Sequence, residues 1–132
     1  MISIDTNVLL RSIVHDDKKQ ARIAMDIIKN NCSIETPGFI SSIVLCEFVW
    51  TLQTSFKYPK TSITATLSRI ITAAEFFIEH HQEAWSALED YKLFNADFSD
   101  YYIAHISKKY GAEKIVTFDI KAAGHAMFEL IK

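Results

Sequence analysis

The chain has 132 residues, of which 49% are hydrophobic and 23% are charged, with a formal net charge of −2. This length and composition predict one globular domain, residues 1–132, with a single core. No apolar run approaches the length of roughly 18 residues that spans a bilayer, and no signal peptide is indicated. The slight negative charge argues against a protein that coats nucleic acid by charge alone. Cys32 and Cys46 lack metal or redox spacing, which fits a reducing, cytoplasmic setting.

Short strands are predicted to alternate with helices along the whole chain. Strands are expected at residues 1–4, 39–40, 75–79 and 114–118. Helices are expected directly after Asp5, over about 17–31, 41–54, 81–93 and 99–110, from Thr61 or Ser62 onward, and in one or two pieces after residue 119. Such alternation predicts an α/β fold, a three-layer α/β/α sandwich with a short, mostly parallel central sheet and right-handed crossovers.

Four carboxylates interrupt apolar surroundings, where acids are rare unless they are paired, hydrogen-bonded or bound to a metal. Asp5 and Asp119 each follow a predicted strand. Because ligands of open α/β sheets bind outside the carboxyl ends of the strands, both are expected to point into one crevice. Asp100 is expected beside that crevice, in the first turn of a helix, where the helix N-terminus favours an anion.

Glu47 is the fourth of these acids and the most informative. It interrupts a segment that is apolar on nearly every helical face, and such a helix is expected to be buried. No Lys or Arg lies within one helical turn of it, so Glu47 needs a partner from elsewhere. Together the four acids predict an all-oxygen site suited to Mg²⁺ or Mn²⁺ rather than zinc, with mutual repulsion raising some of their pKa values.

Each acid also has a simpler interpretation. Asp5 and Asp119 could cap helices, and Glu47 could pair with a distant Arg or His. Asp97 is favoured as the N-cap of the helix and Asp100 as the ligand, although residues three apart on a helix are neighbours and could share the work. A metal role for the adjacent histidines 80 and 81 is not expected, because neighbouring side chains point apart.

Taken together, the blocks around these acids resemble those of PIN-domain ribonucleases, and most of all the VapC toxins of bacterial and archaeal toxin–antitoxin pairs. The resemblance covers nearly the whole chain. Its blocks are Ile4-Asp5-Thr6-Asn7-Val8-Leu9, Glu47 in its apolar helix, Asp97-Phe98-Ser99-Asp100 followed by Tyr101-Tyr102-Ile103-Ala104, and Thr117-Phe118-Asp119.

The resemblance implies a Mg²⁺- or Mn²⁺-dependent endoribonuclease that is the toxin of a type II toxin–antitoxin pair. It implies metal-assisted phosphodiester hydrolysis, an RNA substrate, a homodimer, and a cognate antitoxin that covers the active site. The residues it implies as catalytic metal ligands are Asp5, Glu47, Asp100 and Asp119, and those it implies as supporting groups are Thr6, Asn7, Asp97 and Thr117.

Arg11, in the helix after Asp5, is the basic residue best placed to contact RNA. Other candidates for RNA contact are Lys18, Lys19, Lys57, Lys60, Lys121 and, by stacking, Tyr58. A PIN nuclease of RNA processing or DNA cleavage and a catalytically silent RNA-binding module are the alternatives. A phosphoaspartate receiver or a haloacid-dehalogenase-like phosphatase fits poorly, because position 7 is Asn and adjacent acids are missing after the first strand.

Overall fold

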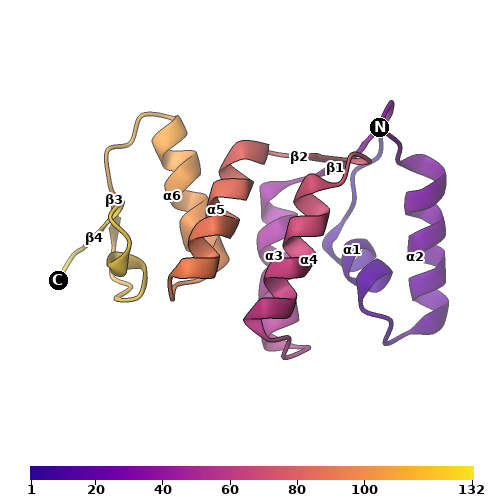
Figure 1. Ribbon diagram of the computed structural model, residues 1–132, viewed down its shortest axis with the longest axis horizontal. Helices are drawn as coiled ribbons and strands as arrows, with labels where there is room; N and C mark the ends of the chain where they lie inside the picture. The colour runs from indigo at the N-terminus through magenta and orange to yellow at the C-terminus, as the bar shows by residue number, and fades with distance from the viewer.

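Six helices and four short strands make up the structure, a computed structural model that describes all residues from Met1 to Lys132. The elements are α1 (Thr6–Ile13), α2 (Lys18–Asn31), β1 (Gly38–Ile40), α3 (Ser42–Thr54), α4 (Lys60–Thr72), β2 (Phe76–Ile78), α5 (His81–Leu93), α6 (Phe98–Lys109), β3 (Ile115–Thr117), the 3-10 helix η1 (Ala122–Gly124) and β4 (Phe128–Leu130). The molecule is elongated, with α1 and α2 at one end, β3 and β4 at the other, and α3 to α6 between them (Figure 1).

Side-chain caps place several of the helices where the sequence predicts them. The Asp17 carboxylate accepts from the backbone N of Gln20 at 3.1 Å, and the Ser41 hydroxyl accepts from the backbone N of Val44 at 3.2 Å. The cap predicted for α4 was wrong, because this helix begins at Lys60 after Pro59, which makes no side-chain cap bond. Proline suits a helix start because its ring presets φ.

Parallel pairing joins the strands, as the α/β prediction requires. Ser3 bridges Phe39, and the backbone N of Ile4 donates to the carbonyl of Phe39 at 2.8 Å. β1 then pairs in parallel with β2. The N-terminal segment, β1 and β2 therefore lie side by side, and their carboxyl ends lead into α1, α3 and the turn before α5.

The C-terminal segment differs from the prediction of a final helix, which was wrong. Residues 122–124 form a single 3-10 turn, and Phe128–Leu130 forms β4, which pairs in parallel with β3. The strands therefore form two separate two-stranded sheets, β1 with β2 and β3 with β4. These lie on opposite sides of the α5–α6 pair (Figure 1), so Asp5 and Asp119 do not end strands of one sheet and the expected shared crevice is not formed that way.

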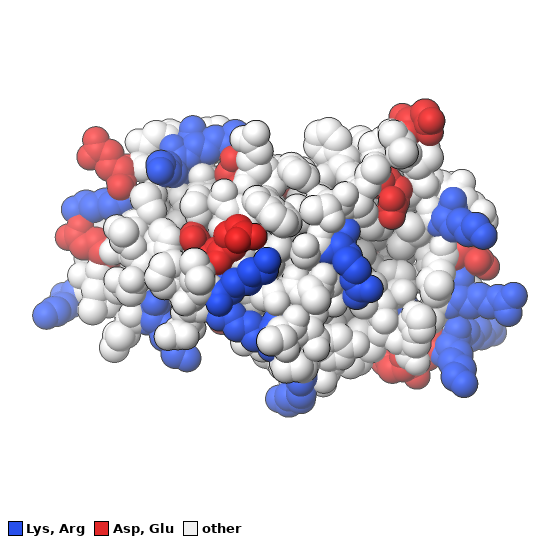
Figure 2. All heavy atoms as spheres, in the orientation of Figure 1, with Lys and Arg blue, Asp and Glu red and all other residues white.

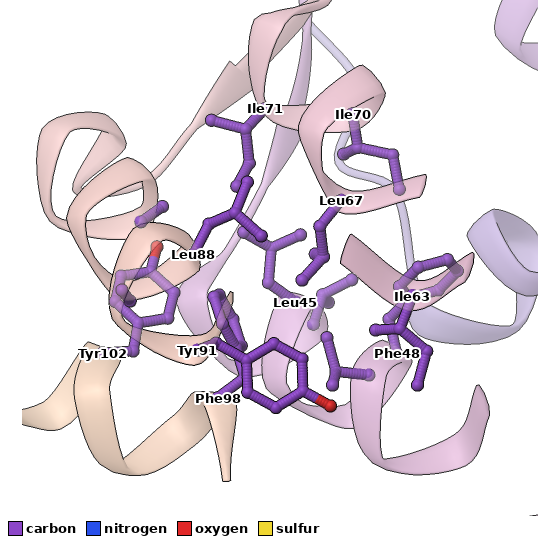
Figure 3. Close-up of a cluster of buried hydrophobic side chains, with 14 of the residues drawn as sticks. Leu45, Phe48, Ile63, Leu67, Ile70, Ile71, Leu88, Tyr91, Phe98 and Tyr102 are labelled. Carbon is purple, nitrogen blue, oxygen red and sulfur yellow. The ribbon is translucent and has the colours of Figure 1, made fainter. Parts of the chain in front are cut away.

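The core lies where α3, α4, α5 and α6 meet, with their apolar side chains directed toward one another (Figure 3). Leu45 and Phe48 of α3, Leu67 of α4 and Leu88 of α5 are completely buried. Burying a side chain of this size contributes about 1.5–3 kcal/mol, so this four-helix contact is the main source of stability. No helix is long and apolar enough to pass through a membrane.

Candidate metal centre

Asp5 stands at the start of α1, where the N-terminal strand segment ends. Its backbone is extended (φ −77°, ψ 159°), and its Oδ1 accepts from the backbone N of Thr6 at 2.8 Å. The carboxylate is thereby held at the positive end of the helix, as the capping interpretation predicts. Asp5 is exposed, so it remains open to a ligand from solvent.

Glu47 is exposed rather than deeply buried, so that expectation was wrong. α3 has one buried face, to which Leu45 and Phe48 belong, while the opposite face leaves Ile43 71% and Trp50 62% exposed. A helix that is apolar on every side is fully buried only if other elements cover all of its sides. The side of α3 that carries Ile43 and Trp50 has no neighbouring element. Across the gap to α1, the Thr6 hydroxyl donates to Glu47 Oε1 at 3.0 Å.

Asp100 occupies the first turn of α6, which Asp97 precedes as N-cap. Its Oδ2 accepts from the backbone N of Asp97 at 3.1 Å. Burial raises the pKa of Asp100 above its ordinary value, and the negative charges of Asp97 and Asp119 raise it further. The repulsion predicted among the acids is therefore present at this position, which identifies Asp119 as an electrostatic neighbour of Asp100.

Asp119 follows β3 and closes the turn into η1. Its Oδ1 accepts from the backbone N of Lys121 at 2.8 Å and of Ala122 at 3.3 Å. The Thr117 hydroxyl accepts from the backbone N of Asp119 at 3.0 Å, which is a supporting contact of the kind expected for that residue. The carboxylate therefore also caps the 3-10 turn.

The four carboxylates share a pattern of contacts that suits metal ligands. In each, a single oxygen accepts hydrogen bonds from the protein and the other has no protein partner. None of the four pairs with Lys or Arg, whose ion pairs all go to other acids. Oriented carboxylates with free oxygens and uncompensated charge are a hard donor set that fits Mg²⁺ or Mn²⁺.

The four acids interact in pairs and do not form a single cluster. Thr6 links Asp5 to Glu47, and Asp100 acts on Asp119 and on Cys46, whose pKa is raised to about 11 by burial and then by the Asp100 charge. Glu47 and Ser99 line one groove of about 360 Å³ between α3 and α6. No three of the four carboxylates lie within 4.8 Å of one another, so a shared ion at this centre stays a prediction.

Two of the predicted residues lie in other surroundings. Asn7 lines the groove between α1 and α2 and makes no hydrogen bond to the acids. The Arg11 guanidinium binds both Asp16 oxygens, at 2.7 and 2.8 Å. Lys and Arg are interspersed with Asp and Glu over the face in Figure 2, without a continuous basic surface. Both bonds to Asp16 come from Nη1, so the Nη2 and Nε donors of Arg11 remain available to a phosphate, while Asp16 offsets the charge of the guanidinium.

Glu79 is a further acid at a strand end that was not selected from the sequence. Its carboxylate accepts from the backbone N of Ser42 at 2.9 Å, and this bond holds the pKa of Glu79 below its usual range. The buried Tyr102 hydroxyl donates to the Glu79 carbonyl at 2.5 Å and accepts from the Ser42 hydroxyl at 3.2 Å. The network fastens the start of α3, and so Glu47, to α6. Its only sequence signal was the position of Glu79 after a strand.

A short parallel β unit, surrounding helices and carboxylates at element ends define an α/β domain with an acidic candidate site. The chain matches the family model of the PIN domain over residues 2–126. It therefore belongs to the PIN domain family, whose members are generally nucleases that use divalent metal ions. No curated protein matches the chain.

Proposed function

We propose that this PIN domain is a Mg²⁺- or Mn²⁺-dependent endoribonuclease, and that it acts as the toxin of a type II toxin–antitoxin pair. The observation that carries the nuclease proposal is the set of four carboxylates, each with a free oxygen and none paired with Lys or Arg. The family match supports it, since PIN domains are generally nucleases. The toxin role rests on the resemblance of the sequence blocks.

The residues proposed to hold the cation are Asp5, Glu47, Asp100 and Asp119. When bound, a divalent cation supplies an activated water and neutralises charge on the phosphate and on the leaving oxygen. The groups that position these ligands are the Thr6 hydroxyl and the backbone N–H groups of Thr6, Asp97, Lys121 and Ala122. Such supporting bonds usually matter for metal affinity by factors of about 10–100.

RNA binding would depend on local contacts, because the net charge of −2 attracts no polyanion. Phosphates are bound by Lys and Arg, and single-stranded bases stack on aromatic rings. The proposed phosphate contacts are Arg11, through the guanidinium donors that Asp16 does not occupy, and Lys121, which is close in sequence to Asp119. Tyr58 is half-buried, so one part of its ring remains available for stacking.

Protein partners are part of the proposal as well: a cognate antitoxin and a second copy of the chain. Several large apolar side chains are exposed on α2 and α3. They are Ile23 (55%), Met25 (47%), Ile27 (45%), Ile43 (71%) and Trp50 (62%). Protein contact surfaces are rich in exposed apolar side chains, so α2 and α3 are the surfaces proposed for these partners.

Cleavage of end-labelled single-stranded RNA by the purified protein tests the nuclease proposal. We expect internal cuts with Mg²⁺ or Mn²⁺, none in EDTA, and none with Ca²⁺ alone. A DNA oligonucleotide of the same sequence separates ribonuclease from deoxyribonuclease activity. Binding of RNA without cleavage under every metal condition would instead indicate the silent RNA-binding module.

Induced expression in bacteria tests the toxin proposal separately. We expect growth arrest with loss of defined transcripts, and no arrest when Asp5→Ala is expressed at the same level. A protein that cleaves RNA in vitro without arresting growth would favour a role in RNA processing instead. The nuclease proposal would survive that outcome, because the two experiments have independent readouts.

A further inference from the structure

Asp90, His105 and His125 meet at a second cluster outside the four carboxylates. His105 Nε2 lies 2.6 Å and His125 Nε2 lies 3.0 Å from the same oxygen, Asp90 Oδ2. All three ligand atoms fall within 4.8 Å of one another. The side chains come from α5, from α6 and from the turn after η1, and they are 20%, 24% and 12% exposed, respectively.

Aromatic rings surround the His125 side of this cluster. The Phe94 and Tyr101 rings each lie 5.5 Å from the His125 ring, and the Phe128 ring lies 6.2 Å away. No Lys or Arg pairs with Asp90. An apolar shell of this kind limits water access and strengthens the interaction between a cation and its ligands.

We propose that Asp90, His105 and His125 form a binding site for a transition-metal ion of the zinc class. Two imidazoles and one carboxylate suit Zn²⁺ or Co²⁺, whereas Mg²⁺ prefers oxygen ligands alone. At zinc bond lengths of about 2.0–2.2 Å, two tetrahedral ligands stand roughly 3.4 Å apart. The present separations of 2.6 and 3.0 Å need to open by less than about 1 Å.

The proton on His125 shows what metal binding changes. Its Nδ1 accepts from the backbone N of Met127 at 3.1 Å, so in the metal-free protein Nε2 carries the proton and donates to Asp90. Coordination needs the lone pair of Nε2. The ring proton moves to Nδ1, which can then no longer accept, so the hydrogen bond from the Met127 backbone N–H to Nδ1 is broken. Binding at this site is therefore expected to shift the Met127 amide resonance.

The site would fasten the C-terminal segment to the helices. His125 lies six positions after Asp119, and Asp90 and His105 lie on the packed pair α5 and α6. Metal at this site would thus restrain the segment that carries Asp119, next to the helix that carries Asp100. The proposal does not depend on nuclease activity, because its readouts are metal binding and stability.

The test is titration of EDTA-treated, dialysed protein with Co²⁺ and Zn²⁺ in excess Mg²⁺, which occupies oxygen-rich sites. We expect one equivalent of Co²⁺ to give visible d–d absorption that Zn²⁺ abolishes, and Zn²⁺ to raise the melting temperature. His105→Gln and His125→Gln keep an N–H donor for Asp90 but remove a metal ligand. Each should lower Zn²⁺ affinity by more than about 100-fold, since loss of a mere supporting partner costs 10–100-fold.

His15→Gln is the matched control, because His15 is exposed and the only hydrogen bond of its ring is to the Ser12 carbonyl. Its Zn²⁺ affinity should equal that of the wild type. The proposal is overturned if the wild type gives no Co²⁺ absorption, or if both Gln variants bind Zn²⁺ as tightly as His15→Gln. Should a Gln variant fail to fold, the Met127 amide of the wild type provides the second readout, and its indifference to Zn²⁺ would also overturn the proposal.

Discussion

The four carboxylates and the Asp90–His105–His125 cluster are built in opposite ways. The carboxylates stand at element ends or on an open helix face, and each accepts hydrogen bonds through one oxygen only. No three of them converge. The other three side chains project from packed helices and one turn, and they already touch.

Charge explains the difference between these two regions. Ionised carboxylates repel one another: burial is the main reason that the pKa of Asp100 is raised, and the charges of Asp97 and Asp119 raise it further. A bound cation would offset that repulsion. An imidazole N–H and a carboxylate attract each other, so their cluster closes without any ion. The experiments below test whether this contrast between an open acidic centre and a closed mixed cluster is correct.

The largest expected effect is loss of RNA cleavage in Asp5→Ala and in Asp100→Asn. Each change removes a proposed ligand, so kcat/KM should fall by more than about 100-fold. The measurement is initial rates of RNA cleavage in saturating Mg²⁺. Asp26→Asn, an exposed acid in the middle of α2 with no polar partner, is the control and should cleave at the wild-type rate. Wild-type rates in Asp5→Ala and Asp100→Asn would remove both residues from the centre.

Next in size is the stability that the closed cluster contributes without metal. His125→Ala deletes a hydrogen bond to a charged, largely buried acceptor, and such bonds contribute about 1.5–3 kcal/mol. The free energy of unfolding in urea with EDTA should fall by that amount. His15→Ala should change it by less than about 0.5 kcal/mol. Equal stability of the two variants would show that the cluster does not hold the C-terminal segment.

A smaller effect is expected from Thr6→Val. The valine keeps the shape of the buried threonine but cannot donate to Glu47 Oε1. Because Glu47 then loses its only protein partner, cleavage at limiting Mg²⁺ should fall by about 3–10-fold. Saturating Mg²⁺ should restore most of the loss. The serine variant, Thr6→Ser, keeps the hydroxyl and should retain the activity; a loss equal to that of valine would exclude this orienting role.

The smallest effect concerns the pH dependence of metal-free stability. Burial raises the pKa of Asp100 in the folded state, so the folded protein binds the proton more tightly than the unfolded chain. The free energy of unfolding therefore falls as the pH rises from the pKa of Asp100 in the unfolded chain to its pKa in the folded protein. Above the folded-state pKa, the full cost of burying the charged carboxylate is present.

Asp100→Asn removes this cost. It should increase the free energy of unfolding in EDTA at pH 7.5 by less than about 1 kcal/mol. The gain should shrink as the pH is lowered and the wild-type carboxyl takes up its proton. Saturating Mg²⁺ should also cancel it by stabilising the wild type alone. A destabilised Asn variant at pH 7.5 would show that the hydrogen bond from Asp97 outweighs burial.

The sequence by itself determined the local elements and the family. Helix starts at Asp5, Asp17 and Ser41 were predictable because a cap and the apolar period of its helix lie within a few residues. Parallel strand pairing was predictable because strands alternate with helices. The PIN relationship was predictable because the acidic blocks occur in the order typical of that family. The role of the four acids as ligands remains a prediction from that order.

Only the tertiary structure decided what surrounds those elements. Glu47 is exposed because no element covers its side of α3. Residues 128–130 form a strand that pairs with β3, in a sheet separate from β1 and β2. Nothing in the sequence around Asp90 indicates a site, yet Asp90 accepts hydrogen bonds from His105 and His125, which are 15 and 35 residues away. Periodicity reports which faces of a segment are apolar. Which faces contact one another depends on packing between segments that are distant in the sequence. This packing brings Asp90, His105 and His125 together and leaves the four carboxylates apart.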